Sequence, residues 1–484
     1  MKLRHARNTL ILLLLLSSGC STVQVASTRP GDPLRVVAPP LGFNARKVEK
    51  SIDQFLISRT GRSGLTASFG NTSPYLFSND TGKFHLVLYG KVGYQDDQAF
   101  TYDVALAVMG FLLNGQQDRA EAILNVLEKD FYLPKNGTYG LYNAYLVSSR
   151  VPLEDLGMGG DGDRMHAGPT LWVAIAALNH AKIARNTRYL EFVLDMVDWC
   201  RSELTYFRFP DGERGGISMG MGWGPDWNKI FSTEHNVDYF SVLQMLHEIY
   251  KESPQEVQII FHLKNVEDTW IQDEMAHIGR WIREIGFDSE AYCFRAGYNE
   301  LGLDNLHILD GTSWGLGGVG PENYAAWGID LDKLIENTER HFGATYTLPT
   351  GEVLRGFDIT DPDGYERARE PLFWFEGTGQ QIIAYSELAR YYARKGDDKR
   401  AHKYGERAVF YTQQMYKFSD YYKLRGALPY MAIRPETYSI VKTLKWEWEI
   451  PRGKDDIQWV GSMSSTMWFL YCCHNFFNPM KWNG

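Results

Sequence analysis

The strongest constraint on the fold is a set of helical segments that are apolar on almost every face. Their sequences include TYDVALAVMGFLL, GPTLWVAIAALNHA and SMSSTMWFLYCCHNFF. A helix without a polar face has to be buried on all sides, so these segments predict a layer of inner helices. They begin 65 to 86 residues apart, near Thr101, Gly168, Thr233, Asp310, Glu376 and Ser462.

A second set of helices, each apolar on one face only, alternates with the first. In the segment from Gln117, the apolar Ala120, Ile123, Leu124 and Leu127 recur at helical spacing, and charges occupy the opposite side. Such helices have one buried and one solvated face, so they predict an outer layer. The other outer helices are expected to start near Asn44, Thr187, Asn265, Asp330 and Asp398.

Six inner and six outer helices with this long period predict stacked helical hairpins, which close naturally into a ring. The pattern resembles the six-hairpin glycosidases, whose all-α (α/α)6 toroid is shared by many sugar-cleaving enzymes, some polysaccharide lyases and sugar epimerases. The resemblance covers residues 44–480 and implies a single toroid domain over 41–484, with long loops and minor β insertions at the funnel face. An open solenoid, or two helical domains, is the alternative. Glycines in WGLGGVG, after Asp310, predict a short or broken fourth inner helix.

The N-terminus has the order of segments that is typical of a secretory signal. Lys2, Arg4 and Arg7 precede the apolar run Leu10–Leu16, and Ser-Ser-Gly stands directly before Cys20. These small residues before a cysteine resemble the bacterial lipobox, which implies cleavage after residue 19 and lipidation of Cys20. An ordinary cleaved signal or a membrane anchor is the alternative, although so short an apolar run cannot span a bilayer.

The residue after the lipidated cysteine, Ser21, implies sorting to the outer membrane, facing the periplasm or the cell surface. Residues 20–40 are rich in Ser, Thr, Pro and Val and are expected to form a flexible tether. The net charge is −9 for the whole chain, and −12 (47 − 59) once the signal peptide is removed. Such an acidic chain has no general attraction to nucleic acid, which is therefore not an expected partner. The resemblance to six-hairpin glycosidases implies a carbohydrate partner, and the lipobox resemblance implies attachment to the membrane through the lipid.

The remaining cysteines do not have the spacing of a metal or redox site. We expect Cys200, Cys293, Cys472 and Cys473 to be mostly buried thiols, with a disulfide between Cys200 and Cys293 as the alternative. The sequence also lacks a phosphate-binding Gly-rich loop and an H-E-x-x-H motif. We therefore expect no cofactor and no metal.

In a toroid, the loops that lead into the inner helices share one face, so acids at the helix starts are candidates for catalysis. Glycoside hydrolysis needs one protonated carboxyl and one ionised carboxylate. We predict that Glu234 is the general acid, with Asp103 and Glu376 as the leading choices for the second group and Asp310 behind them. Each acid has a plainer alternative role, because Asp and Glu also stabilise a first helical turn by satisfying its free N–H groups.

Aromatic and polar residues near the same helix starts are candidates for sugar binding, because C–H faces of sugars stack on rings. The chain has 25 Phe, 14 Trp and 28 Tyr, and most of these rings are expected to fill the core. Only those near the starts of the inner helices are candidates for sugar binding. The predicted substrate-binding residues are Tyr102, His166, Trp172, Trp223, Trp227, His235, Asn236, Asp238, Trp314 and Trp374.

Three functions remain open at this point. The first is a glycoside hydrolase that acts on a polysaccharide or oligosaccharide in the bacterial envelope. The second is a toroid lyase or sugar epimerase, which needs a base such as His166 or His235; a uronate substrate would also need cations, for which Arg164 and Arg214 are the nearest candidates. The third is a catalytically silent sugar-binding lipoprotein that takes part in envelope or exopolysaccharide assembly.

Overall fold

The structure, a computed structural model, describes most of the region that was predicted to form the toroid. The signal peptide, Cys20, nearly all of the tether, Arg164 and Trp223 lie outside the described residues. The described residues are 32, 34, 38–61, 65–71, 98–131, 140–147, 150, 165–221, 227–361, 371–424, 427–432 and 460–482.

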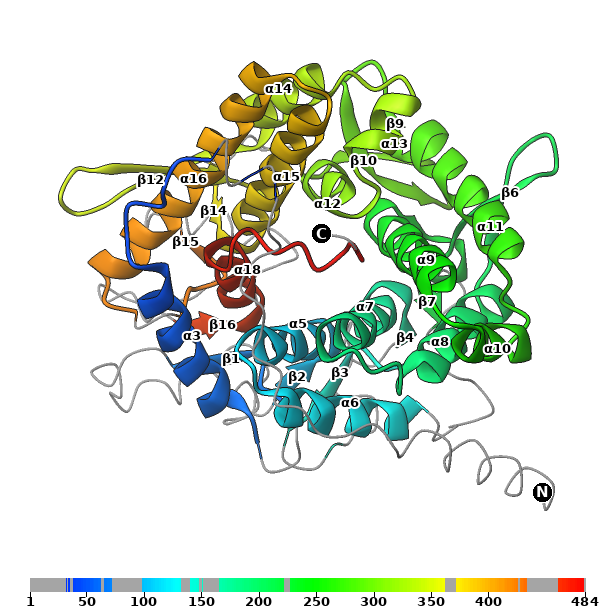
Figure 1. Ribbon diagram of the computed structural model, residues 1–484. Coiled ribbons are helices and arrows are strands. Elements are labelled where there is room, and N and C mark those ends of the chain that lie inside the picture. The colour runs from blue at the N-terminus through cyan, green and yellow to red at the C-terminus, as the bar shows by residue number, and fades with distance from the viewer. Residues whose placement is uncertain are drawn as a thin grey trace.

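Within these residues, the apolar helices form a closed inner ring (Figure 1). Each packs against the next along the chain, and the last, α18, packs against the first, α5. All start within one residue of the positions that hydropathy predicted. Their bounds are α5 (Thr101–Leu113), α7 (Ala167–Ala184), α9 (Thr233–Glu252), α12 (Asp310–Gly318), α15 (Phe375–Arg394) and α18 (Met463–Cys473).

The one-faced helices form the outer layer, and each packs on the inner helix of its own hairpin. The outer helix α3 is the exception, because it lies near the N-terminus and not next to its inner partner along the chain. It packs on α18 and α5 and completes the last hairpin. The ring is therefore closed, which excludes the open solenoid. The outer helices are α3 (Ala45–Arg59), α6 (Gln117–Phe131), α8 (Leu190–Glu203), α11 (Asp268–Trp281), α14 (Leu331–Phe342) and α16 (Asp398–Tyr421).

The fourth inner helix is short, as the glycines predicted, and the structure gives a packing reason for them. A Cβ at Gly315 would lie 1.7 Å from the hydroxyl oxygen of Tyr324, and one at Gly318 would lie 2.1 Å from the hydroxyl of Ser241. The glycines let neighbouring elements approach α12 closely. The shorter helical elements are α10 (Gln255–Leu263), α13 (Pro321–Ala326), the 3-10 turn Trp227–Lys229 and the π turn Ile282–Gly286.

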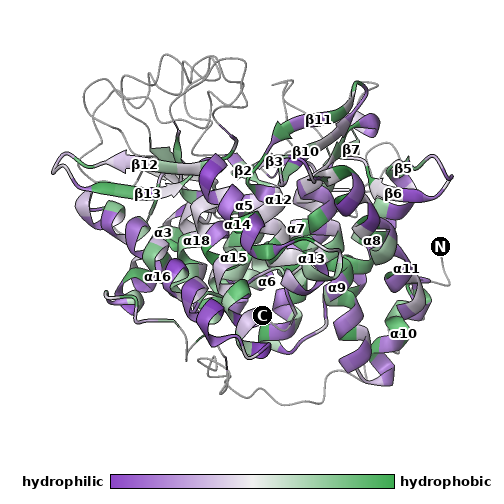
Figure 2. Cartoon of the chain, turned by 90° about the horizontal axis from the view of Figure 1, so that it is seen from above, coloured by the Kyte–Doolittle hydropathy of each residue, from purple (hydrophilic) through white to green (hydrophobic). Residues whose placement is uncertain are grey.

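Short strands gather on one side of the helical ring (Figure 2). Several end directly where an inner helix begins, and their antiparallel pairing fixes the chain there: β2 with β3, β4 with β7, β8 with β10, β14 with β15, and β1 with β16. The strands are β1 (Phe69–Asn71), β2 (Gln98–Phe100), β3 (Ala144–Leu146), β4 (Met165–His166), β5 (Tyr206–Arg208), β6 (Arg214–Ile217), β7 (Gly220–Met221), β8 (Phe231–Ser232), β9 (Phe287–Asp288), β10 (Cys293–Asn299), β11 (Gly302–His307), β12 (Gly343–Thr347), β13 (Val353–Phe357), β14 (Phe373–Trp374), β15 (Met431–Ala432) and β16 (Val460–Ser462).

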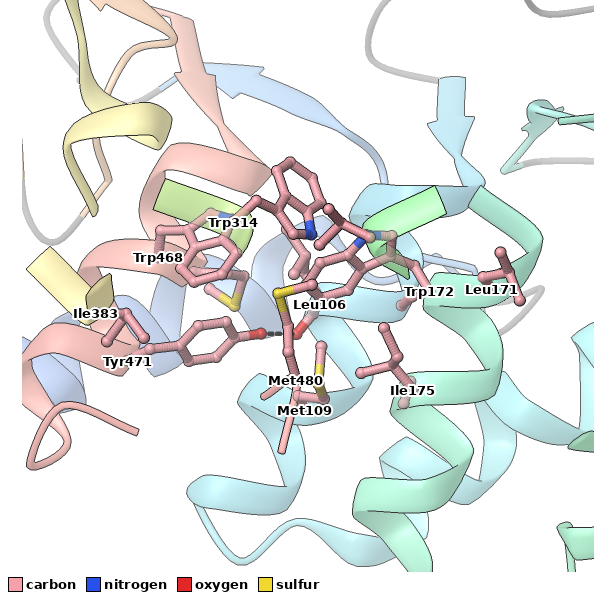
Figure 3. Packing of buried hydrophobic residues seen from close by; sticks show 14 of the residues in the cluster. Leu106, Met109, Leu171, Trp172, Ile175, Trp314, Ile383, Trp468, Tyr471 and Met480 are labelled. Atoms are coloured by element: carbon pink, nitrogen blue, oxygen red, sulfur yellow. Dashed lines mark hydrogen bonds between the residues drawn. The ribbon is translucent and has the colours of Figure 1, made fainter. Parts of the chain in front are cut away.

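A cluster of rings closes the centre of the toroid. Tyr102, Trp172, Trp314 and Trp468 come from different inner helices, with centroid separations of 5.1 Å for Tyr102–Trp172, 5.2 Å for Trp172–Trp314 and 6.3 Å for Trp314–Trp468. Figure 3 shows the three indoles packed together with Met480, which comes from the C-terminal tail. The centre of the ring is therefore a packed aromatic core.

The C-terminal tail seals the ring on the side away from the strands. The amide of Asn179 donates a hydrogen bond of 2.7 Å to the carbonyl of Pro479, and that of Asn478 donates one of 2.9 Å to the carbonyl of Gly317. The indole of Trp482 also donates to Glu252, the last residue of α9. These contacts leave the funnel open at the strand side.

Two further expectations concern the cysteines and the membrane. Cys200 and Cys293 are both free thiols, so the alternative of a disulfide between them was wrong; Cys472 and Cys473 are buried free thiols as expected. In the part of the chain that the structure describes, no helix is both long and apolar enough to cross a bilayer.

Candidate active site

A cavity of about 490 Å³ opens among the first turns of the inner helices. Every inner helix contributes to its lining, because all of them start on the same side of the ring. All four acids that the sequence nominated for catalysis line this cavity: Asp103, Glu234, Asp310 and Glu376. The predicted sugar-binding residues Tyr102, His166, Trp172, His235, Trp314 and Trp374 line it as well.

Three other predicted sugar-binding residues lie off the cavity wall. Asn236 is completely buried, and its amide donates to the carbonyls of Ile217 and Ser232, which gives it a structural task. Asp238 is also completely buried, one turn deeper in α9 than Glu234. Trp227 does not line the cavity, but its ring lies 4.7 Å from that of His166.

The cavity also has lining residues that sequence reasoning missed. Asp304 and Tyr298 come from the hairpin of β10 and β11, and Asn143 and Tyr430 come from segments between helices. These residues stand outside the inner-helix starts, and nothing in the local sequence marked them. Their contribution depends on how the strands fold over the mouth.

Glu376 is held in place by a chain of hydrogen bonds from other inner helices. The Tyr102 hydroxyl donates to its Oε1 at 2.7 Å, and the Trp468 indole donates to the Tyr102 hydroxyl at 2.8 Å. The amide of Gln380 donates to the same Oε1 at 3.3 Å, and Ser313 donates to Gln380. The carboxyl of Glu376 is therefore fixed and receives donors that favour its ionised form.

Burial raises the pKa of Glu376 to about 7, and the hydrogen bonds from Tyr102, Ser464 and Gln380 limit that rise. Burial also raises the pKa of Glu234 to about 7, and the charge of Glu376 adds to this rise. No hydrogen bond opposes it among the described residues. The two glutamates therefore have different surroundings: donors support an ionised Glu376, whereas Glu234 is favoured in its protonated form.

The other two acids that the sequence nominated for catalysis, Asp103 and Asp310, are held as neutral carboxyls by burial. Burial raises the pKa of Asp103 to about 8, even though Ser68 and the backbone of Ser464 hydrogen-bond to it. Burial raises the pKa of Asp310 well above its usual range, and the charges of Glu234 and Glu376 raise it further. The Oδ1 atom of Asp310 has no hydrogen-bond partner among the described residues.

Two histidines lie side by side on one wall, with ring centroids 6.0 Å apart. Nδ1 of His235 is 3.1 Å from the carbonyl oxygen of Met219. A carbonyl only accepts, so Nδ1 carries the proton and Nε2 is left as an acceptor in the neutral ring. Burial lowers the pKa of His235 to about 4, so the ring is neutral at physiological pH. Nε2 of His235 can therefore accept a hydrogen bond from a sugar hydroxyl.

Solved structures share this architecture, although no family model and no curated protein matches the chain. A family 76 glycoside hydrolase from a bovine Bacteroides thetaiotaomicron strain matches at a TM-score of 0.54 and 7% identity, over 90% of this chain and 78% of that one. A GH76 alpha-mannanase of Bacteroides thetaiotaomicron matches at 0.53 and 9%, over 90% and 95%. A cellobiose 2-epimerase from Bacillus thermoamylovorans matches at 0.52 and 8%, over 88% and 98%. The chain therefore has the (α/α)6 toroid fold that these glycoside hydrolases and this epimerase share.

Proposed function

We propose that this protein is a glycoside hydrolase that acts on a polysaccharide or oligosaccharide of the bacterial envelope. The observation that carries the proposal is the pair Glu234 and Glu376. Each is the second residue of its inner helix, and both line the same cavity. Each has a pKa raised to about 7, and hydrogen-bond donors such as Tyr102 support the ionised form of Glu376. An acid and an ionised carboxylate are the pair that glycoside hydrolysis requires.

In this mechanism Glu234 protonates the oxygen of the departing sugar. Glu376, held by Tyr102 and Gln380, either activates a water molecule or attacks the anomeric carbon. Asp103 is less suited to this second role, because a carboxyl with a pKa of about 8 is mostly neutral at pH 7. Partly buried rings that line the cavity, such as Tyr102 and Tyr298, offer stacking surfaces for the sugar.

The fold supports this proposal, since the solved structures of a family 76 glycoside hydrolase and of a GH76 alpha-mannanase each match this chain over 90% of its length. Among the described residues that line the cavity there is no lysine or arginine, which disfavours a lyase for uronates. Arg214 does not line the cavity, and its guanidinium pairs with Glu274 at 2.7 Å. Arg164 lies outside the described residues.

A Glu234→Gln variant tests the proposal on a panel of glycans. We expect the activity of the mature chain to fall at least 1,000-fold, because position 234 can then no longer donate a proton to the departing sugar. The thermal unfolding midpoint should stay within a few degrees. Glu352→Gln, which changes an exposed acid far from the cavity, is the matched control and should keep full activity. Full activity of Glu234→Gln would overturn the assignment of the acid, and sugar binding without turnover by the unaltered chain would favour the silent sugar-binding protein.

A second candidate is a sugar epimerase, which needs a base, and it is favoured by His235: its Nδ1 is bound to the Met219 carbonyl, so its Nε2 is the nitrogen that could take a proton from a sugar carbon. The two candidates give different products. A hydrolase yields shorter sugars, whereas an epimerase run in D₂O yields an isomer of unchanged length that carries one deuterium at the inverted carbon. The second result would replace the hydrolase proposal.

A further inference from the structure

The cavity holds more carboxyl groups than glycoside hydrolysis uses. Among the described lining residues, the acids are Asp103, Glu234, Asp304, Asp310 and Glu376, and no lysine or arginine is present. Two of these acids suffice for the reaction. The carboxyls that the reaction does not use can bind a ligand that carries hydrogen-bond donors or a positive charge.

In the described part of the chain, the basic side chains next to the lining residues of β8, β10 and β11 are already engaged with acids outside the cavity lining. Arg295 and His307, on the strands that precede α12, both contact Asp288, at 2.7 and 3.2 Å. Lys229, next to the lining segment of β8, pairs with Glu300. None of these cations neutralises the cavity.

Asp310 is the most exceptional of these acids. Its side chain stands at the start of α12, between α9 and α15, and is only 6% exposed. The charged groups that face it are Glu234 and Asp238 from α9 and Glu376 from α15. All are acids, and its Oδ1 has no partner among the described residues. Burying a carboxyl oxygen without a donor is costly, so a ligand that brings a donor or a positive charge would be bound favourably here.

We propose that the sugar recognised in this cavity carries a free amino group, and that Asp310 is the carboxylate that binds its ammonium. The substrate class is thus an unacetylated amino sugar within a saccharide chain. Asp304, at the mouth, adds to the attraction without direct contact. The ammonium would give Asp310 a charged donor, and the rings that line the cavity would add cation–π attraction. Turnover of such a chain rests on the proposed hydrolase function, whereas binding does not.

Binding to the Glu234→Gln chain, measured by calorimetry, separates the two proposals. The probes are matched short oligomers of glucosamine, N-acetylglucosamine and glucose. We expect the glucosamine oligomer to bind at least tenfold more tightly than the other two, with a preference that weakens as salt is raised. Equal affinities for glucosamine and glucose oligomers would overturn the inference.

Asp310→Asn keeps the size of the side chain and removes its ability to ionise when the ammonium binds. We expect this variant to lose at least tenfold of its affinity for the glucosamine oligomer, while its affinity for the glucose oligomer changes less than threefold. Asp304→Asn is the control. It should reduce the preference for the glucosamine oligomer over the glucose oligomer by less than threefold, and the salt dependence of that preference by less than threefold. An equal loss for both oligomers in Asp310→Asn would mean a structural role and would contradict the proposal.

A measurement on the chain with Asp310 intact does not depend on that variant folding. Asp310 is held neutral by burial, so pairing with an ammonium at pH 6 should release close to one proton to the buffer. Titrations in buffers of different ionisation enthalpy detect that proton; the glucose oligomer should release none. Binding of the amino sugar without proton release would contradict the pairing. If amino sugars bind in this way but none is hydrolysed by the unaltered chain, the hydrolase proposal fails and this inference stands.

Discussion

The hydroxyl of Tyr102 donates a hydrogen bond of 2.7 Å to Oε1 of Glu376 across 274 residues of sequence. Tyr102 belongs to α5 and Glu376 to α15, and the helix between them in the ring, α18, supplies Trp468 as a donor to the same hydroxyl. The bond joins a residue nominated for sugar binding to one nominated for catalysis. It gives Tyr102 a second task, which is to stabilise the ionised form of Glu376.

Tyr102→Phe removes that hydrogen bond and leaves the ring in place. A hydrogen bond to a charged acceptor contributes about 1.5 to 3 kcal/mol, so its loss should raise the pKa of Glu376 by about one to two units. The acid limb of kcat/KM should move to higher pH, with at least a tenfold loss at pH 6. Tyr298→Phe, which removes another cavity hydroxyl, is the control and should leave that limb where it is. An unmoved acid limb in Tyr102→Phe would contradict the role of Glu376.

The pH profile of the unaltered enzyme should be a narrow bell centred near pH 7. Activity needs Glu376 ionised and Glu234 protonated, and the pKa of each is raised to about 7 by burial. Activity is therefore lost below neutrality as Glu376 gains a proton, and above it as Glu234 loses one. Initial rates between pH 4 and pH 10 test this expectation. A flat optimum from pH 5 to pH 8 would speak against the pair.

Stability should decrease between about pH 4 and pH 8. Burial raises the folded-state pKa of Asp103 to about 8, while the same group in the unfolded chain titrates near 4. The folded state therefore binds more protons in this window, so the free energy of unfolding falls as pH rises. Asp103→Asn should flatten the curve by about 1 to 3 kcal/mol between pH 5 and pH 8. Chemical unfolding at both pH values measures the difference; an unchanged slope would contradict it.

A buried ion network holds the C-terminal tail against α15. Glu387 contacts Arg390 at 2.8 Å and Lys481 at 3.0 Å, and Arg390 also reaches Asp32 at 3.2 Å. Burial by itself would raise the pKa of Glu387, but Lys481 and Arg390 lower it to about 2. The network thus joins both ends of the described chain to the far side of the ring.

Glu387→Gln should destabilise the protein strongly, because it leaves buried cations without their common partner. The expected loss is about 3 to 5 kcal/mol of unfolding free energy in urea titrations. Glu352→Gln breaks the exposed pair with Lys417 and should change that free energy by less than about 1 kcal/mol. Similar effects of the two variants would show that the buried network has no special contribution.

The lipid anchor that we predict at Cys20 can be tested in cells that carry the full-length chain. We expect the protein in the outer-membrane fraction, with the N-terminal cysteine labelled by fatty acid. Cys20→Ser should abolish the label and move the protein out of the membrane fraction, because serine has no thiol to carry the lipid that is expected to hold the protein there. Retention of the variant in the membrane would favour the alternative of a membrane anchor.

The sequence by itself determined the ring of hairpins and the positions of the acids within it. Hydrophobic periodicity is a local property, so the starts of the inner helices were predicted to within one residue from composition along each helix. The acids at those starts followed directly, and so did the rings of Trp172 and Trp314. Even the short fourth helix could be predicted from its glycines.

Only the tertiary structure decided how each acid is surrounded. Asp103 and Glu376 both stand in the first turn of an inner helix, yet Tyr102 and Gln380 support the charge of Glu376, while burial keeps Asp103 neutral. Closure by α3, the seal made by the tail, and Asp304 at the mouth were equally beyond the sequence. The physical reason is that hydrogen bonds, desolvation and neighbouring charges arise from residues far apart along the chain, and only the closed ring brings them together.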